Sequence, residues 1–265
     1  MGNRRIGLGR VEALLENLKR EIQLSGSTIC ALQGASHGSF GSPPVVIDAD
    51  STVADGTDST IHQYPDGLRL HCSALGTQTI LIPAAATTGM NYAFDQTDDD
   101  GLQWCASMTG HKGHPGVDRF TVGTHGAFYA ELKFSIATVA GTDDCAFGFR
   151  KVEALQANVD DYDEMAALNV ISGNITIETI LNAAGTVSTD TTANWADGET
   201  HTLRIDVSSA GVVTYKIDGS APATTAAFTF DSGEVVTPFF FQLQANGAQT
   251  GALVLQEVKW GLVGK

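Results

Sequence analysis

The feature that most constrains the fold of this chain is a strict alternation of apolar and polar residues in its second half. Leu132, Phe134 and Ile136 alternate with polar neighbours, and the same pattern recurs over residues 202–207 and 213–217. Successive side chains of a β-strand point to opposite faces, so this period predicts strands with one buried face. The last two segments are expected to pair as a hairpin whose second strand runs up to the turn Asp218-Gly219.

The rest of the body has the same character. From about residue 61 onward, turn signals recur at short intervals, and the composition is rich in Gly, Ala, Thr, Val and Asp, which suits strands joined by tight turns. A chain of 265 residues can bury a full core without disulfides. We therefore predict an all-β sandwich over residues 61–265, with further strands at 145–151, 166–171, 174–181, 239–245 and 252–261.

The N-terminal segment differs, because residues 10–24 have the period of an amphipathic helix and Ser25-Gly26 ends that pattern. The apolar stripe spans about two heptads, and so short a helix needs a partner surface to be stable. We expect residues 1–25 to be a short N-terminal α-helix that docks on sister chains or on another protein. The stripe consists of Val11, Leu14, Leu15, Leu18 and Ile22.

Residues 26–60 are predicted to be an extended arm or linker between this helix and the sandwich. The segment is dense in Ser, Gly, Ala, Thr, Asp and Pro, and it contains Pro43-Pro44. Such a composition favours extended, irregular chain over packed elements.

Charge is distributed unevenly along the chain. The formal net charge is −15, but residues 1–25 carry +2 and the body therefore −17. The basic residues of the N-terminal tip include Arg4, Arg5 and Arg10, which we interpret as a basic docking arm. An acidic body argues against a nucleic-acid partner, since phosphate backbones are held by clustered Lys and Arg.

The sequence shows neither a secretory signal nor an apolar run of membrane-spanning length. We expect synthesis in a cytoplasm and no membrane partner. The four cysteines, Cys30, Cys72, Cys105 and Cys145, contain no CxxC pair. They are expected to be free and mostly buried thiols.

Two stretches in the second half resemble a known fold. Residues 197–207 and 211–219 are similar to the hairpin of laminin-G, pentraxin and concanavalin-like jelly rolls, in which a strand ends in Tyr-x-Ile-Asp-Gly. Residues 238–243 and 253–260 resemble the final strands of that fold. The resemblance implies a concanavalin-like jelly-roll sandwich, and it implies little about activity.

A second resemblance is to structural proteins of marine tailed phages. Residues 5–22 are similar to the start of such proteins, which precedes a β-rich body, and residues 147–153 are similar to a stretch within them. This resemblance implies a location in a virion and not an activity.

The sandwich of laminarinase-type glucanases carries its catalytic carboxylates on one strand as Glu-x-Asp-x-x-Glu. The comparable segment is residues 161–169, where Glu164 is followed by Ala166 and Asn169 at the positions that require acids. Retaining hydrolysis needs two carboxyl groups about 5–5.5 Å apart. We therefore predict that the chain is not an enzyme.

Metal sites have partial signals only. A calcium loop keyed on Gly101 fails the EF-hand spacing, although loop carboxylates can bind calcium without a tight motif. A histidine site lacks a committed fourth ligand. We predict no metal and no cofactor. The histidines are interpreted as part of a surface loop, namely His111, His114 and His125. The acids are interpreted as acidic turns, namely Asp95, Asp98, Asp99, Asp100, Asp143, Asp144, Asp160 and Asp161.

Three tryptophans are candidates for sugar stacking. Trp104 and Trp260 lie in apolar, strand-like segments and are predicted to be core residues. Trp195 lies in a turn and is the one tryptophan predicted to offer an exposed platform for a glycan, with packing over the sandwich edge as the favoured alternative.

These observations lead to one functional prediction and two alternatives. The chain is predicted to be a capsid decoration or cement protein, a homotrimer on the outer surface of a phage capsid, which binds the major capsid protein through its N-terminal region. The first alternative is a head- or tail-fibre component whose sandwich binds host surface glycans. The second alternative is a carbohydrate-active enzyme whose site escapes sequence inspection.

Overall fold

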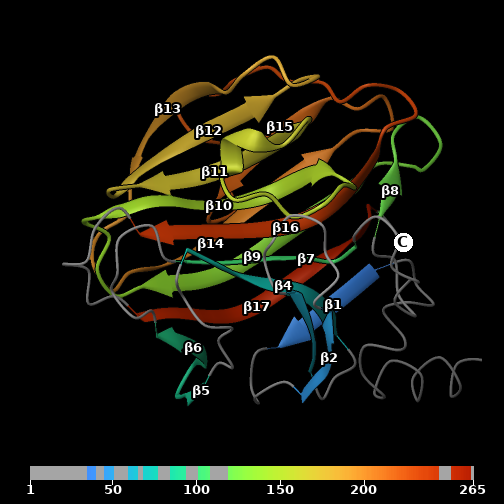
Figure 1. Ribbon diagram of the computed structural model, residues 1–265. Coiled ribbons are helices and arrows are strands. Elements are labelled where there is room, and N and C mark those ends of the chain that lie inside the picture. The colour runs from blue at the N-terminus through green and yellow to red at the C-terminus, as the bar shows by residue number, and fades with distance from the viewer. Residues whose placement is uncertain are drawn as a thin grey trace, which may run out of the picture.

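The computed structural model describes residues 35–39, 45–50, 59–64, 68–76, 84–93, 101–107, 119–244 and 252–263. Within these ranges the chain forms seventeen strands and one short 3-10 turn, and no α-helix. The strands make two antiparallel sheets that pack face to face as a sandwich (Figure 1). Among the described residues, no helix is both long enough and apolar enough to cross a membrane.

The smaller sheet has seven strands. Its central pair is β9 and β17, and β1 pairs with β17 beyond the part of β17 that pairs with β6. The strand order is β15 (Val213–Ile217), β14 (Thr200–Val207), β9 (Phe128–Ile136), β17 (Ala252–Leu262), β6 (Gly89–Ala93) and β5 (Ala84–Ala86), with β1 (Ala35–Ser39) beside β17.

The larger sheet has ten strands, with β10 and β16 near its middle. A short strand, β8 (Phe120–Thr121), pairs with the start of β16. The order is β13 (Val187–Asn194), β12 (Asn174–Ile180), β11 (Met165–Ile171), β10 (Thr142–Lys151), β16 (Val235–Gln244), β7 (Gly101–Cys105), β4 (Arg69–Leu75), β3 (Ser59–Gln63) and β2 (Val45–Asp50).

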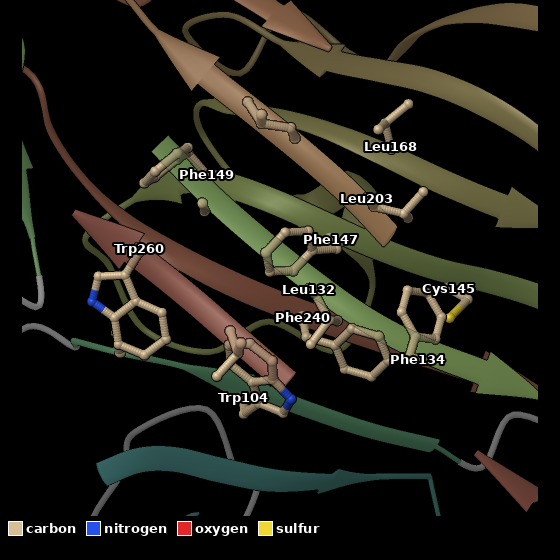
Figure 2. Packing of buried hydrophobic residues seen from close by; sticks show 14 of the residues in the cluster. Trp104, Leu132, Phe134, Cys145, Phe147, Phe149, Leu168, Leu203, Phe240 and Trp260 are labelled. Carbon is tan, nitrogen blue, oxygen red and sulfur yellow. The ribbon is translucent and has the colours of Figure 1, made fainter. Parts of the chain in front are cut away.

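The main core lies between the two sheets and combines aromatic rings with aliphatic side chains (Figure 2). Trp104 stacks on Phe240 with ring centres 5.7 Å apart, and Phe134 meets Phe240 edge to face at 5.8 Å. Burying each such side chain contributes about 1.5–3 kcal/mol. The buried positions of Trp104 and Trp260 confirm their prediction as core residues.

The alternation seen in the sequence sets which side chains enter this core. In β9, Leu132, Phe134 and Ile136 are buried while the residues between them face solvent. β14 pairs with β15 from Leu203 opposite Ile217 to Val207 opposite Val213, so the predicted hairpin is confirmed. The further predicted strands correspond to β10, β11, β12, β16 and β17.

A second apolar cluster covers the outward face of the larger sheet. The segment 152–164 crosses this face and includes the 3-10 turn η1 (Val159–Asp161). Its side chains Leu155, Val159 and Tyr162 pack on outward residues of the strands beneath. Gln103 of β7 fixes the segment by donating to the carbonyl of Gln156 at 2.7 Å and accepting from Tyr162 Oη at 2.6 Å. Part of the outward face is therefore already occupied.

The predicted arm over residues 26–60 needs correction. Residues 35–39 form β1 and pair with β17, whereas residues 45–50 form β2 and pair with β3. An extended segment exposes unpaired backbone donors and acceptors, and the edge of a sheet satisfies them. These parts of the segment therefore belong to the sandwich and do not form a linker to it.

Two other expectations meet the structure only in part. The predicted helix over residues 1–25 lies outside the described residues, together with its stripe and its basic arm. Cys72, Cys105 and Cys145 are buried thiols outside any disulfide, as expected. Cys30 lies outside the described residues.

Candidate functional site

A polar cluster interrupts the apolar outward face of the larger sheet where β10, β11 and β12 run side by side. Asn169 of β11 lies opposite Ala146 of β10 and Thr176 of β12. Its side chain points outward, because Ala167 two residues earlier belongs to the outward apolar cluster. Glu178 is the register partner of Ala167, so its side chain shares that face.

The side-chain amide of Asn169 joins two carboxylates. Its nitrogen Nδ2 donates to Asp144 Oδ1 at 2.6 Å and to Glu178 Oε2 at 2.7 Å. Its oxygen Oδ1 accepts the backbone N–H of Cys145 at 2.8 Å, which fixes the amide between the two acids. We call these three residues, Asp144, Asn169 and Glu178, the bridged carboxylate site.

The site is graded in exposure. Asn169 is fully buried, and only 5 % of Glu178 is exposed, whereas Asp144 is half-buried at the margin of the site. The charge of the exposed Asp160 of η1 acts on Asp144, and Thr186, just before β13, donates its hydroxyl to Asp160 Oδ1 at 2.6 Å. Asp144 therefore presents the accessible carboxylate of the site.

Burial shifts the protonation of both acids. Desolvation raises the pKa of Asp144 to about 6, against the lowering effect of the hydrogen bond from Asn169. Desolvation likewise raises the pKa of Glu178 to about 7, and the negative charges of Asp144 and Asp160 add to the shift. Neutral pH thus lies close to the pKa of Glu178, and the protonation of the site responds to physiological pH.

Shifted acids on one face of a sheet often mark functional sites. The two carboxylates bond to a single nitrogen, so the bonded oxygens lie no further apart than about 5–5.5 Å, the spacing that retaining glycosidases use. However, Glu178 is almost fully covered and both acids are held by Asn169. This arrangement is better suited to accepting hydrogen bonds at Asp144 than to transferring protons to a substrate.

The segment compared with glucanases contributes only Asn169 to this site. Glu164 is buried just before β11, and its Oε1 accepts the backbone N–H of Asp231 at 3.0 Å. Ala166 belongs to the core between the sheets, on the opposite face from Asn169. From the sequence, Asn169 is identifiable only as a missing acid, because its connection with Asp144 and Glu178 depends on the register of the sheet. A signal was present in β12, where Thr176 and Glu178 alternate with buried isoleucines.

The predicted metal candidates divide between described and undescribed residues. Asp95, Asp98, Asp99, Asp100, His111 and His114 lie outside the described residues. Within the described part of the chain, no group of three or more His, Cys, Asp or Glu side chains is placed to hold a metal ion. His125 Nδ1 accepts the backbone N–H of Thr121 at 2.6 Å, so this ring supports the turn after β8.

The exposed platform predicted for Trp195 needs correction. Only 2 % of this residue is exposed, and its ring packs 4.6 Å from Phe134 and 4.5 Å from His201. Its indole N–H donates to the carbonyl of Glu199 at 3.1 Å. Both ring faces are enclosed where the turn folds over the end of the core, so the favoured alternative of packing over the sandwich edge describes this residue.

The sequence matches no protein-family model, and no curated protein matches it either. Solved structures do match. A protein of unknown function from Shewanella oneidensis MR-1 is 9 % identical, with a TM-score of 0.53, and the match covers 100 % of this chain and 98 % of that one. This likeness concerns the fold alone, and the two packed antiparallel sheets agree with the sandwich that the sequence predicts. The fold is a concanavalin-like jelly roll.

Two carbohydrate recognition domains are also similar to this jelly roll. That of Emp47p is 11 % identical, with a TM-score of 0.48, and the match covers 85 % of this chain and 96 % of that one. That of Emp46p, in a potassium-bound form, is 9 % identical with a TM-score of 0.49, covering 72 % and 88 %. Similarity at this level concerns the fold and not the ligand.

Proposed function

We propose that this chain is a non-catalytic, glycan-binding jelly roll carried by a tailed-phage virion. The observation that supports glycan binding is the half-buried carboxylate of Asp144. Asn169 holds this carboxylate in place by donating from Nδ2 to Asp144 Oδ1. An ionised carboxylate has about four acceptor positions in total. Sugar hydroxyls are donors, and charge-assisted hydrogen bonds to a fixed carboxylate are stronger than neutral ones.

Asp160, Thr186 and Ser188 supply further acceptors and hydroxyls, and all three retain exposed surface. Thr186 donates to Asp160, and Ser188 lies opposite Glu178 in the sheet. Because the acceptor is already ordered by Asn169, little side-chain entropy is lost when a ligand binds. A shallow polar surface of this kind suits one or two sugar units and does not need an aromatic platform.

The charge of the site restricts the class of glycan. Asp144 and Glu178 share the Asn169 amide, and the negative charge of Asp160 raises the pKa of both acids. Anionic sugars would add a further negative charge to this surface and be repelled. We therefore expect neutral or amino-bearing glycans to bind and sialylated or sulfated glycans to bind weakly.

The virion location rests on the sequence resemblance of residues 5–22 and 147–153 to structural proteins of tailed phages. A sandwich that recognises host surface glycans would then serve as a head- or tail-fibre component. The absence of catalysis is part of the same proposal. Glu178 is almost fully covered, so it does not reach a bound sugar as the second carboxyl group of a hydrolytic pair.

A glycan array tests this proposal. Wild-type protein should bind a subset of neutral or amino glycans, and Asp144→Ala should abolish that binding while leaving the melting temperature within a few degrees. Asp143→Asn is the matched control, because it removes one negative charge from an exposed neighbour on the same strand. Equal loss in both variants, or no glycan binding at all, would overturn the proposal. Release of reducing sugar from a bound glycan would overturn the non-catalytic part.

The N-terminal segment favours a second candidate, a capsid decoration protein. Residues 1–25 combine an apolar stripe with a net charge of +2 on a body of −17. A segment that binds only the assembled capsid would stabilise the head by mass action. Binding to the major capsid protein and a homotrimeric state belong to this candidate. Copy number separates the two candidates, since decoration proteins coat the whole lattice and fibres do not.

A further inference from the structure

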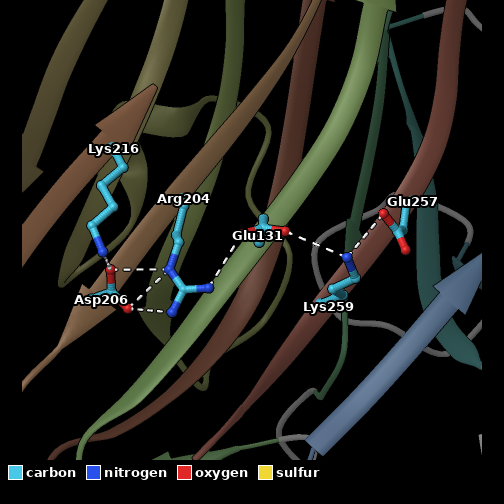
Figure 3. Close-up of polar contacts among 6 residues, drawn as sticks. All are labelled: Glu131, Arg204, Asp206, Lys216, Glu257 and Lys259. Atoms are coloured by element: carbon cyan, nitrogen blue, oxygen red, sulfur yellow. Dashed lines mark hydrogen bonds and ion pairs between the residues drawn. The ribbon is translucent and has the colours of Figure 1, made fainter. Parts of the chain in front are cut away.

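A row of six charged side chains crosses the outward face of the smaller sheet (Figure 3). The row runs from β15 through β14 and β9 to β17, and its charges alternate in sign along its length. We call it the charge ladder, and in order it consists of Lys216, Asp206, Arg204, Glu131, Lys259 and Glu257.

Each neighbouring pair in the ladder is in contact. Lys216 Nζ lies 3.0 Å from Asp206 Oδ2, and Arg204 Nη2 lies 2.7 Å from Asp206 Oδ1. Arg204 Nη1 then reaches Glu131 Oε2 at 3.2 Å. At the far end, Lys259 Nζ lies 3.6 Å from Glu131 Oε1 and 3.0 Å from Glu257 Oε2. The side chains are thereby ordered before any partner arrives.

The ladder lies flat on the sheet. The side chains of Asp206, Arg204 and Glu131 are about one-quarter exposed, and the guanidinium of Arg204 lies 4.0 Å from the centre of the Tyr129 ring. The two ends are the most accessible, with 40 % of the Lys216 side chain and 37 % of the Glu257 side chain exposed. An ordered, flat polar face loses little entropy on association.

This face also differs in charge from the rest of the body. Four of the ten basic residues in residues 26–265 lie on it, namely Lys133, Arg204, Lys216 and Lys259. Two strongly acidic bodies repel each other over most of their surfaces. The charge-balanced face is where two copies approach with least repulsion.

The order of charges adds a specific geometry. Read from Lys216 to Glu257, the signs alternate and begin with a positive charge. Read from Glu257 to Lys216, they alternate and begin with a negative charge. A second copy of the row in the reverse direction therefore offers the opposite charge at each position. The row is not straight, because Asp206 and Glu257 lie to opposite sides of the line through Arg204 and Glu131. A two-fold axis in the interface plane, tilted from the strand direction and crossing the row between Arg204 and Glu131, brings Lys216 of one copy to Glu257 of the other. The same operation brings Arg204 to Glu131, and every facing pair has opposite charge. A closed two-fold interface requires this self-complementarity.

We propose that two copies of this chain associate face to face through the charge ladder, about that two-fold axis. This association goes beyond glycan binding and uses the opposite sheet from the bridged carboxylate site. Surface ion pairs are individually weak and screened by salt, so the dimer forms at high local concentration, as on a particle, and dissociates as ionic strength rises.

Charge reversal at the two ends tests the register. Lys216→Glu alone places two negative charges together in the dimer, and Glu257→Lys alone places two positive charges together. Each single variant should weaken association roughly tenfold or more, measured by sedimentation velocity of the full chain at about 50 mM salt. The double variant restores opposite charges at both ends and should recover association to within about threefold of wild type.

Two further measurements complete the test. Asp190→Lys, on exposed β13 of the other sheet, changes the net charge as Glu257→Lys does and should leave association unchanged. In a mixture of unlabelled and nitrogen-15-labelled wild-type chains, carbodiimide should link Lys216 of one copy to Glu257 of another. These residues lie at opposite ends of the ladder, so that link is intermolecular. Failure of the double variant to recover, or absence of the mixed-label link, would overturn the proposal even if a single variant misfolds.

Discussion

Asp144 and Glu178 share one hydrogen-bond donor group, the side-chain amide of Asn169, which lies 2.6 Å from the first carboxylate and 2.7 Å from the second. The three residues come from three adjacent strands of the larger sheet. Two acids that would otherwise repel each other are thereby held together on a largely buried surface, and this arrangement determines several measurable properties.

Replacing the shared donor should be costly. Asn169→Asp has nearly the same shape but removes both N–H donors and adds a third carboxyl group. We expect a loss of roughly 3 kcal/mol of unfolding free energy at pH 8, and a smaller loss at pH 5, where carboxyl groups with raised pKa values are protonated. Urea denaturation at both pH values measures this. Asn174→Asp, at the exposed start of β12, is the control, and an equal loss there would contradict the bridging role.

The pKa of Glu178, raised to about 7 by burial, links stability to pH. A carboxyl group whose folded pKa lies above its unfolded value contributes stability that is complete below about 4.5 and is lost as pH rises through about 7. Glu178→Gln keeps an acceptor for Asn169 but does not ionise. The melting temperature of Glu178→Gln should therefore rise relative to that of wild type as the pH increases from 5 to 8. An equal change of melting temperature in the two proteins over this range would contradict the raised pKa of Glu178.

His62 of β3 should have the opposite effect. It is fully buried, neither ring nitrogen has a hydrogen-bond partner within the described part of the chain, and burial lowers its pKa to about 4. A histidine with a lowered folded pKa contributes stability that is present above 6.5 and is lost as pH falls toward 4. His62→Leu should thus reduce acid destabilisation between pH 6.5 and pH 4.5, measured as the urea midpoint. An unchanged pH dependence would contradict the buried neutral ring.

Trp195 should act on stability and not on binding. Its ring fills the end of the core against Phe134, so Trp195→Ala should lower the unfolding free energy by about 3–5 kcal/mol. Trp195→Phe should cost less, because most of the ring volume remains. Both folded variants should retain the wild-type glycan profile. Lost glycan binding without lost stability would restore the platform interpretation.

Substitutions in the N-terminal apolar stripe test whether the chain is a capsid decoration protein. Large apolar side chains such as those of the stripe are each worth about 1.5–3 kcal/mol when a partner buries them. Leu15→Asp with Leu18→Asp in the full chain should abolish co-sedimentation with phage particles and leave the melting temperature of the sandwich unchanged. Asn17→Asp, between the two positions, is the matched control. Retained association of the double variant would rule out docking through the stripe.

The sequence alone predicts the parts of this fold that are encoded locally. The alternation in β9, β14 and β15 identifies both the strands and their buried faces, because each strand carries its own pattern. β1 and β2 carry no such pattern. β1 pairs with β17 at the other end of the chain, and β2 pairs with the neighbouring β3, so composition alone predicts an arm here.

The bridged carboxylate site was beyond sequence inspection for the same reason. Asn169 is 25 residues from Asp144 and 9 residues from Glu178, and only the register of the sheet brings them together. Trp195 illustrates the converse. Turn residues are usually exposed, but Phe134 and His201, which are distant from each other in sequence, enclose this ring.

Calorimetric titration of an array-selected glycan into wild-type protein and Asp144→Asn tests the central claim most directly. The substitution keeps the shape of the side chain and removes the charge that strengthens its hydrogen bonds to sugar hydroxyls. We expect the affinity for the glycan to fall by about tenfold or more in Asp144→Asn and to stay at the wild-type value in Asp143→Asn. Equal affinity of wild type and Asp144→Asn for the same glycan would contradict it.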